Sequence, residues 1–227
     1  MQKNLWHFGD SFGNSCEEEH HHIFKIAKRN NLYYHDCILT GKSNYMILNY
    51  IIQHMNKFKE GDLVYIHWSF FQRGEYIDDN MDLQSTNVWY DETHKNLHSG
   101  SENLIFSHRN TILNYFLNFN FDSTVKLFDW LVKPILDYLE HKKITVVNCF
   151  VEKDPLLLNG VELKDGSAIK LNNEITFGSE EKPLYFKKYL ESRGWRNEEC
   201  CHYTNGIQEE LSVIIENKIK KYYSFPK

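Results

Sequence analysis

The hydrophobic residues of this chain follow two different periods, one typical of strands and the other typical of helices. Short apolar runs, each ended by polar or turn-forming residues, lie at residues 5–8, 32–39, 63–68 and 144–150. Elsewhere apolar residues recur every three to four positions, as on the buried face of a helix, at residues 17–29, 43–55 and 206–222. This ordering of strand-type and helix-type segments predicts an α/β sandwich rather than an all-α or all-β fold.

Two long stretches lack this regular pattern. Residues 70–103 are rich in Asp, Asn, Ser and His, and we interpret them as an excursion over one end of the sheet. Residues 154–178 carry Asn-Gly and Asp-Gly pairs between short apolar runs, which predicts an inserted hairpin. A helical stretch over 107–141 should break near Pro134, because a proline inside a helix removes a backbone hydrogen bond. No linker or internal repeat divides the 227 residues, so we expect a single domain over residues 1–227.

The charged residues give the chain a formal net charge of -5, from 26 Lys and Arg against 31 Asp and Glu. This balance excludes the broad positive field that sequence-independent nucleic-acid binding requires. The five cysteines lie at scattered positions and do not resemble a disulfide framework, so we expect a reducing compartment. No signal peptide or membrane-spanning stretch is evident, which predicts a cytoplasmic protein without a membrane partner. No oligomeric state is indicated.

Candidate chemistry begins directly after the first strand-type run, at Asp10 and Ser11. Open α/β sheets bind ligands at the carboxyl ends of their strands. A serine hydroxyl there needs a base, and His202 lies in a predicted loop before the last helix, with Glu199 three residues earlier. Serine, histidine and an acid form the minimum set for acyl transfer: a nucleophile, a general base and a group that orients the imidazole. The plainer interpretation, that the serine only caps the following helix, stays open.

These residues resemble the motifs of the SGNH (GDSL) hydrolase family. Members of that family open with a strand and the sequence Gly-Asp-Ser, which is matched here by Gly9, Asp10 and Ser11. Their second block contributes a glycine after the second strand, and Gly41 stands at that place. By the order of its elements the resemblance spans the whole chain, whereas the matching motif residues are confined to the two ends and the loop around Gly41.

The last block of the family places the catalytic histidine shortly before the closing helix and three residues after an acid, usually aspartate. His202 fits this place, with Glu199 as the acid, and Glu198 competes for the same role. The resemblance therefore implies that Ser11 is the nucleophile, that His202 is the base and that Glu199 orients His202.

One block departs from the family's pattern. The third block normally supplies Gly-x-Asn-Asp after the third strand, and the asparagine side chain is an oxyanion donor. Here the third strand continues into Ser69-Phe70-Phe71-Gln72, with no asparagine in that place. Ser69, Gln72 and, from the neighbouring loop, Asn44 are the candidate replacements. Loss of one such donor typically lowers the rate ~10²–10³-fold.

The resemblance implies a three-layer α/β/α sandwich with a mostly parallel, flavodoxin-like sheet. It also implies a serine esterase that needs no metal or organic cofactor and acts on a small-molecule or carbohydrate ester, with an O-acetyl group on a sugar as one candidate. Two alternatives stay open. One is an O-acyltransferase, and the other is a binding module that has lost turnover and recognises a glycan or a protein partner, which the missing asparagine favours.

Aromatic residues make up 15% of the chain, and several lie near the expected active end of the sheet. Trp68 and Arg73 flank that end, and Trp89, Tyr90 and His94 belong to the excursion. Aromatic rings beside one guanidinium would suit a sugar or an acylated polar substrate. The alternative is that these rings anchor a long loop to the core.

A tract of three histidines, at positions 20 to 22, resembles a metal-binding sequence. Neighbouring residues on a helix point about 100° apart, so they do not share one ion. We therefore expect the tract on a solvated helix face and predict no metal site.

Overall fold

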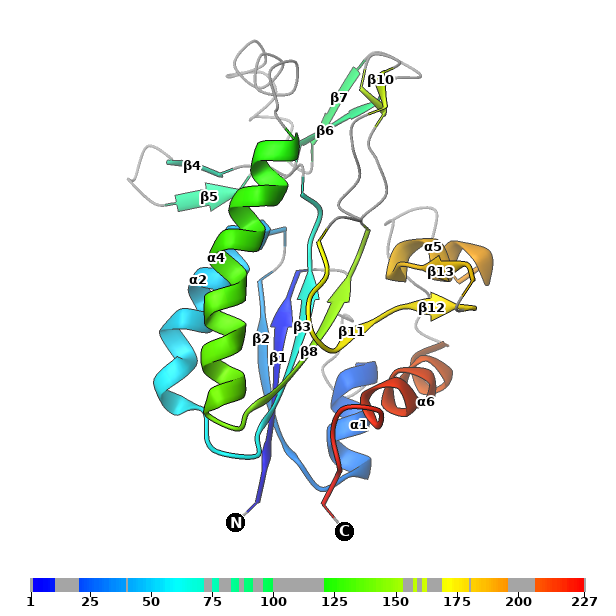
Figure 1. Cartoon of the computed structure of the whole chain (residues 1–227). Helices are drawn as coiled ribbons and strands as arrows, with labels where there is room; N and C mark the ends of the chain where they lie inside the picture. Colours follow the sequence, from blue (N-terminus) through cyan, green and yellow to red (C-terminus); the bar gives the residue numbers. More distant parts are fainter. Residues whose placement is uncertain are drawn as a thin grey trace.

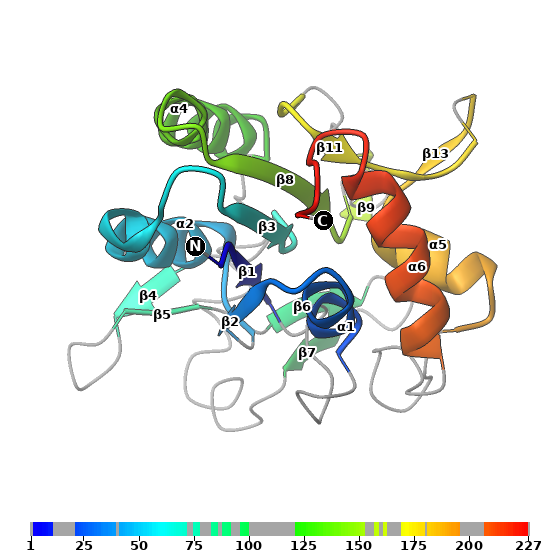
Figure 2. The same cartoon turned by 90° about the horizontal axis from the view of Figure 1, so that it is seen from below.

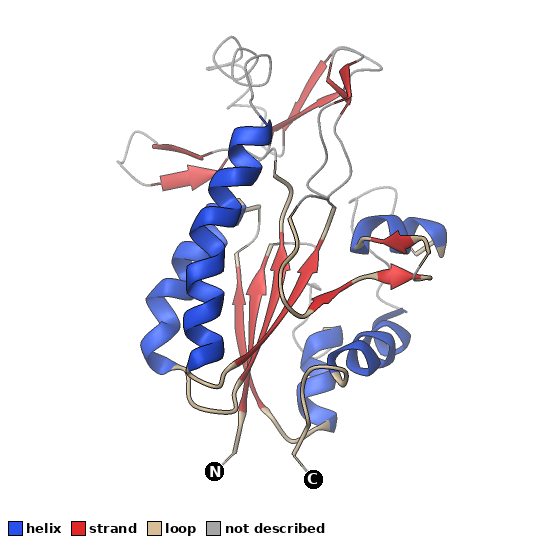
Figure 3. Cartoon of the chain, in the orientation of Figure 1, coloured by secondary structure: helices blue, strands red, loops and turns tan. Residues whose placement is uncertain are grey.

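The computed structural model of the chain describes a central sheet and the helices that cover it. The described ranges are 2–10, 21–39, 41–71, 75–77, 83–85, 88–91, 96–99, 121–152, 157–158, 161–162, 169–179, 181–195 and 207–226. The main sheet contains β1 (Asn4–Gly9), β2 (Tyr33–Ile38), β3 (Leu63–Trp68), β8 (Thr145–Phe150) and β11 (Glu174–Ile175). Figure 1 and Figure 3 show these strands at the centre of the molecule.

The strands of the main sheet lie in the order β11-β8-β3-β1-β2, and every neighbouring pair is parallel. When the five strands are numbered by their order along the chain, the sheet reads 2-1-3-4-5 from its β2 edge. This is the flavodoxin-like order, in which the strand order reverses between β1 and β3. The prediction of an α/β fold with a mostly parallel sheet is therefore confirmed.

Helices cover both faces of this sheet. They are α1 (His22–Arg29), α2 (Asn44–His54), α4 (Phe121–His141), α5 (Phe186–Ser192) and α6 (Gln208–Ile219), with the short 3-10 helix η3 (Met55–Lys57) after α2. Helices α2 and α4 lie on one face, and α1, α5 and α6 lie on the other, which gives three layers (Figures 1 and 2). None of the helices in the described ranges is both long enough and apolar enough to cross a membrane.

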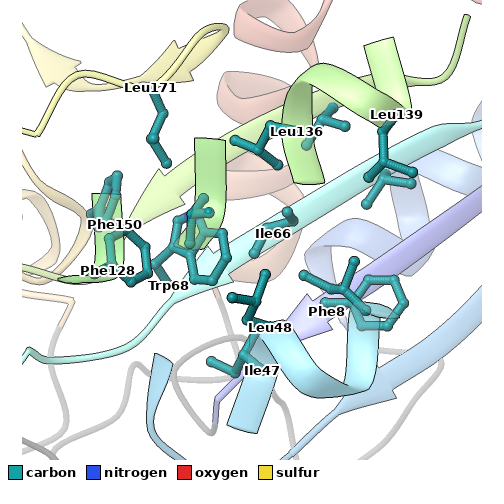
Figure 4. Packing of buried hydrophobic residues seen from close by; sticks show 14 of the residues in the cluster. Phe8, Ile47, Leu48, Ile66, Trp68, Phe128, Leu136, Leu139, Phe150 and Leu171 are labelled. Atoms are coloured by element: carbon teal, nitrogen blue, oxygen red, sulfur yellow. The ribbon is translucent and has the colours of Figure 1, made fainter. Parts of the chain in front are cut away.

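The two faces of the sheet bury separate hydrophobic cores, because successive side chains of a strand point to opposite sides. On β3, Val64 and Trp68 pack toward α2 and α4. Leu63 and Tyr65 of the same strand pack toward α1, α5 and α6. Figure 4 shows the first of these cores, in which the ring of Phe128 meets Trp68 edge-on at 5.0 Å between centroids. Each large apolar side chain buried in this way stabilises the fold by about 1.5–3 kcal/mol.

Helix α4 continues through Pro134, so the predicted break at this residue is wrong. The core-facing residues of α4 include Phe128, Val132 and Leu136, whereas Pro134 is exposed on the opposite face. The carbonyl that loses its helical partner belongs to Trp130, whose side chain is 71% exposed, so water can solvate that side of the helix. The solvated position explains why the proline is tolerated.

Short strands occupy parts of the two segments that lacked a regular pattern. Within 70–103, β4 (Glu75–Ile77) pairs with β5 (Leu83–Ser85), and β6 (Val88–Asp91) pairs with β7 (Asn96–Ser99), both antiparallel. Within 154–178, β9 (Leu157–Leu158) and β10 (Val161–Glu162) form an antiparallel pair. The second segment also contains β11 and β12 (Phe177–Gly178), and β12 pairs with β13 (Pro183–Leu184). The sequence patterns predicted neither the strands of the first segment nor the fifth strand of the main sheet.

Candidate functional site

Four of the predicted site residues belong to the described part of the chain, and they lie just beyond the carboxyl ends of β1, β2 and β3. These four are Asp10, Gly41, Asn44 and Ser69. The other five lie outside the described residues, and they are Ser11, Gln72, Arg73, Glu199 and His202. The roles proposed for these five residues stay predictions.

Strands β1 and β3 approach each other so closely at their carboxyl ends that only glycine fits at position 9. Gly9 is opposite His67 in the ladder. A Cβ atom on Gly9 would lie 2.7 Å from the Cβ atom of His67 and 2.9 Å from its carbonyl oxygen. Any side chain at position 9 would therefore force the strands apart. The glycine keeps together the two strand ends from which Asp10 and Ser69 project.

Asp10 and Ser69 are joined directly by a hydrogen bond across these strand ends. The Ser69 hydroxyl donates to Oδ2 of Asp10 at 2.8 Å, and both residues are fully buried. Asp10 is the residue before Ser11, so the bond fixes the backbone immediately preceding the proposed nucleophile. A buried carboxyl group that lacked such a donor would be strongly unfavourable. Ser69 therefore stabilises Asp10 in its buried position.

Asn44 holds the backbone of Ser69 from the other side. The backbone N–H of Ser69 donates to Oδ1 of Asn44 at 2.7 Å, and Nδ2 of Asn44 donates to the Ser69 carbonyl at 3.1 Å. Asn44 is the first residue of α2, and Ser43 caps that helix by accepting the Met46 N–H at 3.3 Å. Ser43 is therefore the N-cap of α2. This leaves the Asn44 amide free to bind the end of β3.

Gly41 shapes the turn that connects β2 to α2. Its φ angle of +71° lies in the left-handed region, which favours glycine because other residues have a Cβ clash there. The backbone N–H of Leu39 donates to the Gly9 carbonyl at 2.8 Å, and the Lys42 N–H donates to the Leu39 carbonyl at 3.2 Å. The turn is therefore attached to the end of β1, beside the Asp10–Ser69 pair.

The donors of Ser69 are engaged inside this network. Its hydroxyl donates to Asp10, and its backbone N–H donates to Asn44. A donor that is already bound within the protein is not directed at a substrate oxygen. Asn44 has a second amide N–H beyond the one that binds Ser69. The geometry therefore favours a positioning role for Ser69. It leaves Asn44 with one amide N–H that could donate a hydrogen bond to a substrate oxygen.

Trp68 is a core residue. Its side chain is fully buried, and Nε1 donates to Oδ1 of Asn148 at 2.9 Å. This favours the alternative in which the ring anchors the end of the sheet, and it excludes Trp68 as an exposed surface for a sugar. The side chains of Trp89 and Tyr90, like His94, lie outside the described residues.

The expectation that the histidine tract lies on a solvated face is wrong for the two residues that the structure describes. His21 is 2% exposed and His22 is fully buried. Nδ1 of His21 accepts the backbone N–H of Ile23 at 3.1 Å and so caps α1. His22 donates its backbone N–H to Oε1 of Gln208 at 2.9 Å, which ties the start of α1 to α6. The tract was misinterpreted because helix α1 begins at His22, so its first residues turn inward.

Two further histidines on the strands face the same interior. His7 and His67 are fully buried, and they occupy the same side of their strands as Leu5 and Tyr65. Side chains alternate between the two faces along β1 and β3, and this alternation puts both histidines on the same face as apolar residues. The sequence pattern would therefore have identified them as buried. The edge of the His67 ring meets Phe186 of α5 at 4.5 Å between centroids.

These histidines are held in the neutral form. Burial lowers the pKa of His22 and His67 to about 3, and the neighbouring His67 lowers that of His22 further. The pKa values of His7 and His21 are also well below the usual 6.5, again mainly because of burial and then because of neighbouring histidines. Four imidazoles thus lie in neutral form on the side of the sheet that α1, α5 and α6 cover.

A cavity of about 160 Å³ lies elsewhere, lined by residues of β11, β12, α6 and the segment that follows α6, among them Glu174, Lys218 and Tyr222. None of the four described site residues lines it. Within the described ranges, no group of three or more His, Cys, Asp or Glu side chains is arranged to hold a metal ion. No protein-family model matches the chain, and no curated protein matches it in sequence.

Proposed function

We propose that this chain is a serine ester hydrolase of the SGNH type, with O-acetyl groups on carbohydrates as the first class of substrate to test. The buried hydrogen bond between Ser69 and Asp10 carries this proposal. It joins the ends of β1 and β3, between which the strand order reverses. In open parallel sheets this reversal is where ligands bind. Ser11 follows Asp10 directly, so the sequence motif coincides with the place where the fold favours a site.

In the proposed reaction, the Ser11 hydroxyl attacks the ester carbonyl while His202 accepts its proton. Glu199 orients the imidazole, and Glu198 is the alternative acid. Backbone N–H groups of Ser11 and Gly41 stabilise the oxyanion, with the second amide N–H of Asn44 as an additional donor. His202 returns the proton to the departing alcohol, and a covalent acyl-serine remains. Water, deprotonated by His202, then releases the carboxylic acid and restores Ser11.

The test is hydrolysis of p-nitrophenyl acetate and of acetylated sugars by the wild type, Ser11→Ala and His202→Ala. Ser192→Ala and His141→Ala are matched controls, because both residues are exposed on helices. We expect activity in the wild type and both controls, and loss of at least about 10³-fold in Ser11→Ala and His202→Ala. Full activity in Ser11→Ala would refute the assignment of the nucleophile.

A second candidate function is a binding module for a glycan or a protein partner. The binding module is favoured because both donors of Ser69 already form hydrogen bonds within the protein. The oxyanion site therefore has fewer donors for a substrate than the same site in a family member that has the third-block asparagine. This candidate predicts a folded wild type that hydrolyses none of the esters. It also predicts that acetylated glycans bind and shift in NMR the amide signals of Gly41 and Asn44.

A further inference from the structure

Four buried histidines from three elements lie on the side of the sheet that α1, α5 and α6 cover, and the ring of Phe186 contacts both His22 and His67. His7 comes from β1, His67 comes from β3, and His21 and His22 form the start of α1. The ring centroid of His21 lies 4.8 Å from that of His7 and 4.4 Å from that of His22. His7 and His22 are 6.4 Å apart. We call these four residues the histidine cluster.

Among the described residues, the side chains that contact the histidine cluster are neutral at physiological pH. They are Tyr34 of β2, Tyr65 of β3, Phe186 of α5 and Gln208 of α6. Among the described residues, no carboxylate, lysine or arginine contributes to the lowered pKa values of the four histidines, and the charges that act on them are those of other cluster members. A proton on His7, His21 or His67 therefore has no counter-ion among the described residues.

Several polar atoms of the histidine cluster have no hydrogen-bond partner in the described residues. They are Nε2 of His7, Nε2 of His21, both ring nitrogens of His67 and Nε2 of the neighbouring Gln208. Buried polar atoms without partners are rare in folded proteins, and each calls for a reason. Aliphatic side chains at His7 and His67 would fill the same interior without this cost.

We propose that the histidine cluster is an acid-responsive latch, which holds α1 and the start of α6 on the sheet at neutral pH and releases them when its histidines are protonated. A protonated ring is expelled from a buried site by loss of hydration and by repulsion from a second protonated neighbour. Gln208 accepts from both the backbone N–H and Nδ1 of His22, at 2.9 Å and 3.2 Å, so α1 and α6 are released together.

The sign and size of the effect follow from the folded-state pKa values. The pKa of His22 and of His67 is about 3 in the folded chain, against an ordinary 6.5. The open state therefore binds more protons, so the stabilisation is complete above pH 6.5 and is lost as the pH falls toward 3. At pH 5 the opening equilibrium should rise about 30-fold for one such histidine and about 1000-fold for two.

The latch adjoins both segments that carry the proposed catalytic residues. Residues 11–20 lead directly into His21, and residues 196–206 lead into α6. Opening of the latch would therefore alter the environment of Ser11 and His202. Only this consequence, acid inactivation of the hydrolase, rests on the proposed function, because the latch itself is measured without any substrate.

The test is hydrogen exchange of the intact chain at pH 7.5, 6.0 and 5.0, corrected for the intrinsic pH dependence of exchange. We expect amides of α1 and of the first turn of α6 to lose at least about 30-fold in protection at pH 5.0. Amides of α4, on the opposite face, should keep their protection. Unchanged protection in α1 would overturn the proposal, and so would an equal loss in α4, which would indicate global unfolding.

Two variants and one further measurement separate the latch from other acid effects. His67→Phe removes one buried titratable ring and should reduce the pH response of α1 by about 30-fold. His141→Gln, at an exposed position of α4, should leave it unchanged. If His67→Phe does not fold, NMR titration of the wild-type imidazoles decides: the four cluster rings should stay neutral in the folded chain at pH 5.5. Ordinary titration of these rings near pH 6.5 without loss of α1 protection would overturn the proposal.

Discussion

Asn44 pairs with both polar groups of the Ser69 backbone, so its replacement by alanine should destabilise the fold. Asn44→Ala leaves the Ser69 N–H and carbonyl without their side-chain partner in a buried setting. Each buried polar group left unpaired costs about 1–3 kcal/mol. Alanine is the better helix former by up to about 0.7 kcal/mol, which offsets a small part of this cost. With two such groups, the expected net loss is therefore about 1.3–6 kcal/mol in the free energy of unfolding.

Urea unfolding followed by tryptophan fluorescence measures this loss, because most of the usual range of domain stability, about 5–15 kcal/mol, lies above it. Asn49→Ala is the matched control, since Asn49 is exposed on the same helix, and it should change the stability by less than about 0.5 kcal/mol. If Asn44→Ala costs no more than Asn49→Ala, the pairing with Ser69 does not stabilise the end of β3. The positioning role that we assign to this network would then be refuted.

Three further changes test other parts of the structure. Gly9→Ala should destabilise the fold by about 1–3 kcal/mol in urea unfolding, because the alanine Cβ would lie 2.7 Å from the Cβ of His67. An unchanged stability would show that the strand ends can separate freely. Pro134→Ala should raise the melting temperature, because the alanine N–H restores a hydrogen-bond donor for the Trp130 carbonyl. An unchanged or lower melting temperature would contradict our view that the proline is merely tolerated. Burial raises the pKa of the Cys149 thiol to about 12, so this cysteine should react with a disulfide reagent at pH 8 only after the protein unfolds. Rapid reaction in the native protein would contradict its buried position.

The parts of the fold that the sequence predicts well are those that depend on local pattern. The run at Leu63–Trp68 has the same bounds in the structure as in the prediction, because a strand buried on both faces is apolar at nearly every position. The helical spacing of apolar residues over 43–55 likewise predicted α2, which the structure places at Asn44–His54. In both cases the information lies within a few neighbouring residues.

The parts that the sequence did not predict depend on contacts between distant segments. Strand β11 has only two residues and gains its strand character by pairing with β8. The bonds between Asn44 and Ser69 join residues 25 positions apart, and no local pattern reports them. The burial of His21 and His22 depends on α5 and α6 closing over them, so composition alone suggested a solvated face.

Covalent labelling of Ser11 tests the proposed hydrolase most directly. A fluorophosphonate reacts with a serine hydroxyl only when a neighbouring base activates it, and mass spectrometry locates the adduct. We predict one adduct, on the peptide that contains Ser11. It should be absent in Ser11→Ala and His202→Ala and unchanged in Ser192→Ala. A wild type that forms no adduct, or an adduct that persists in Ser11→Ala, would contradict the proposed serine chemistry.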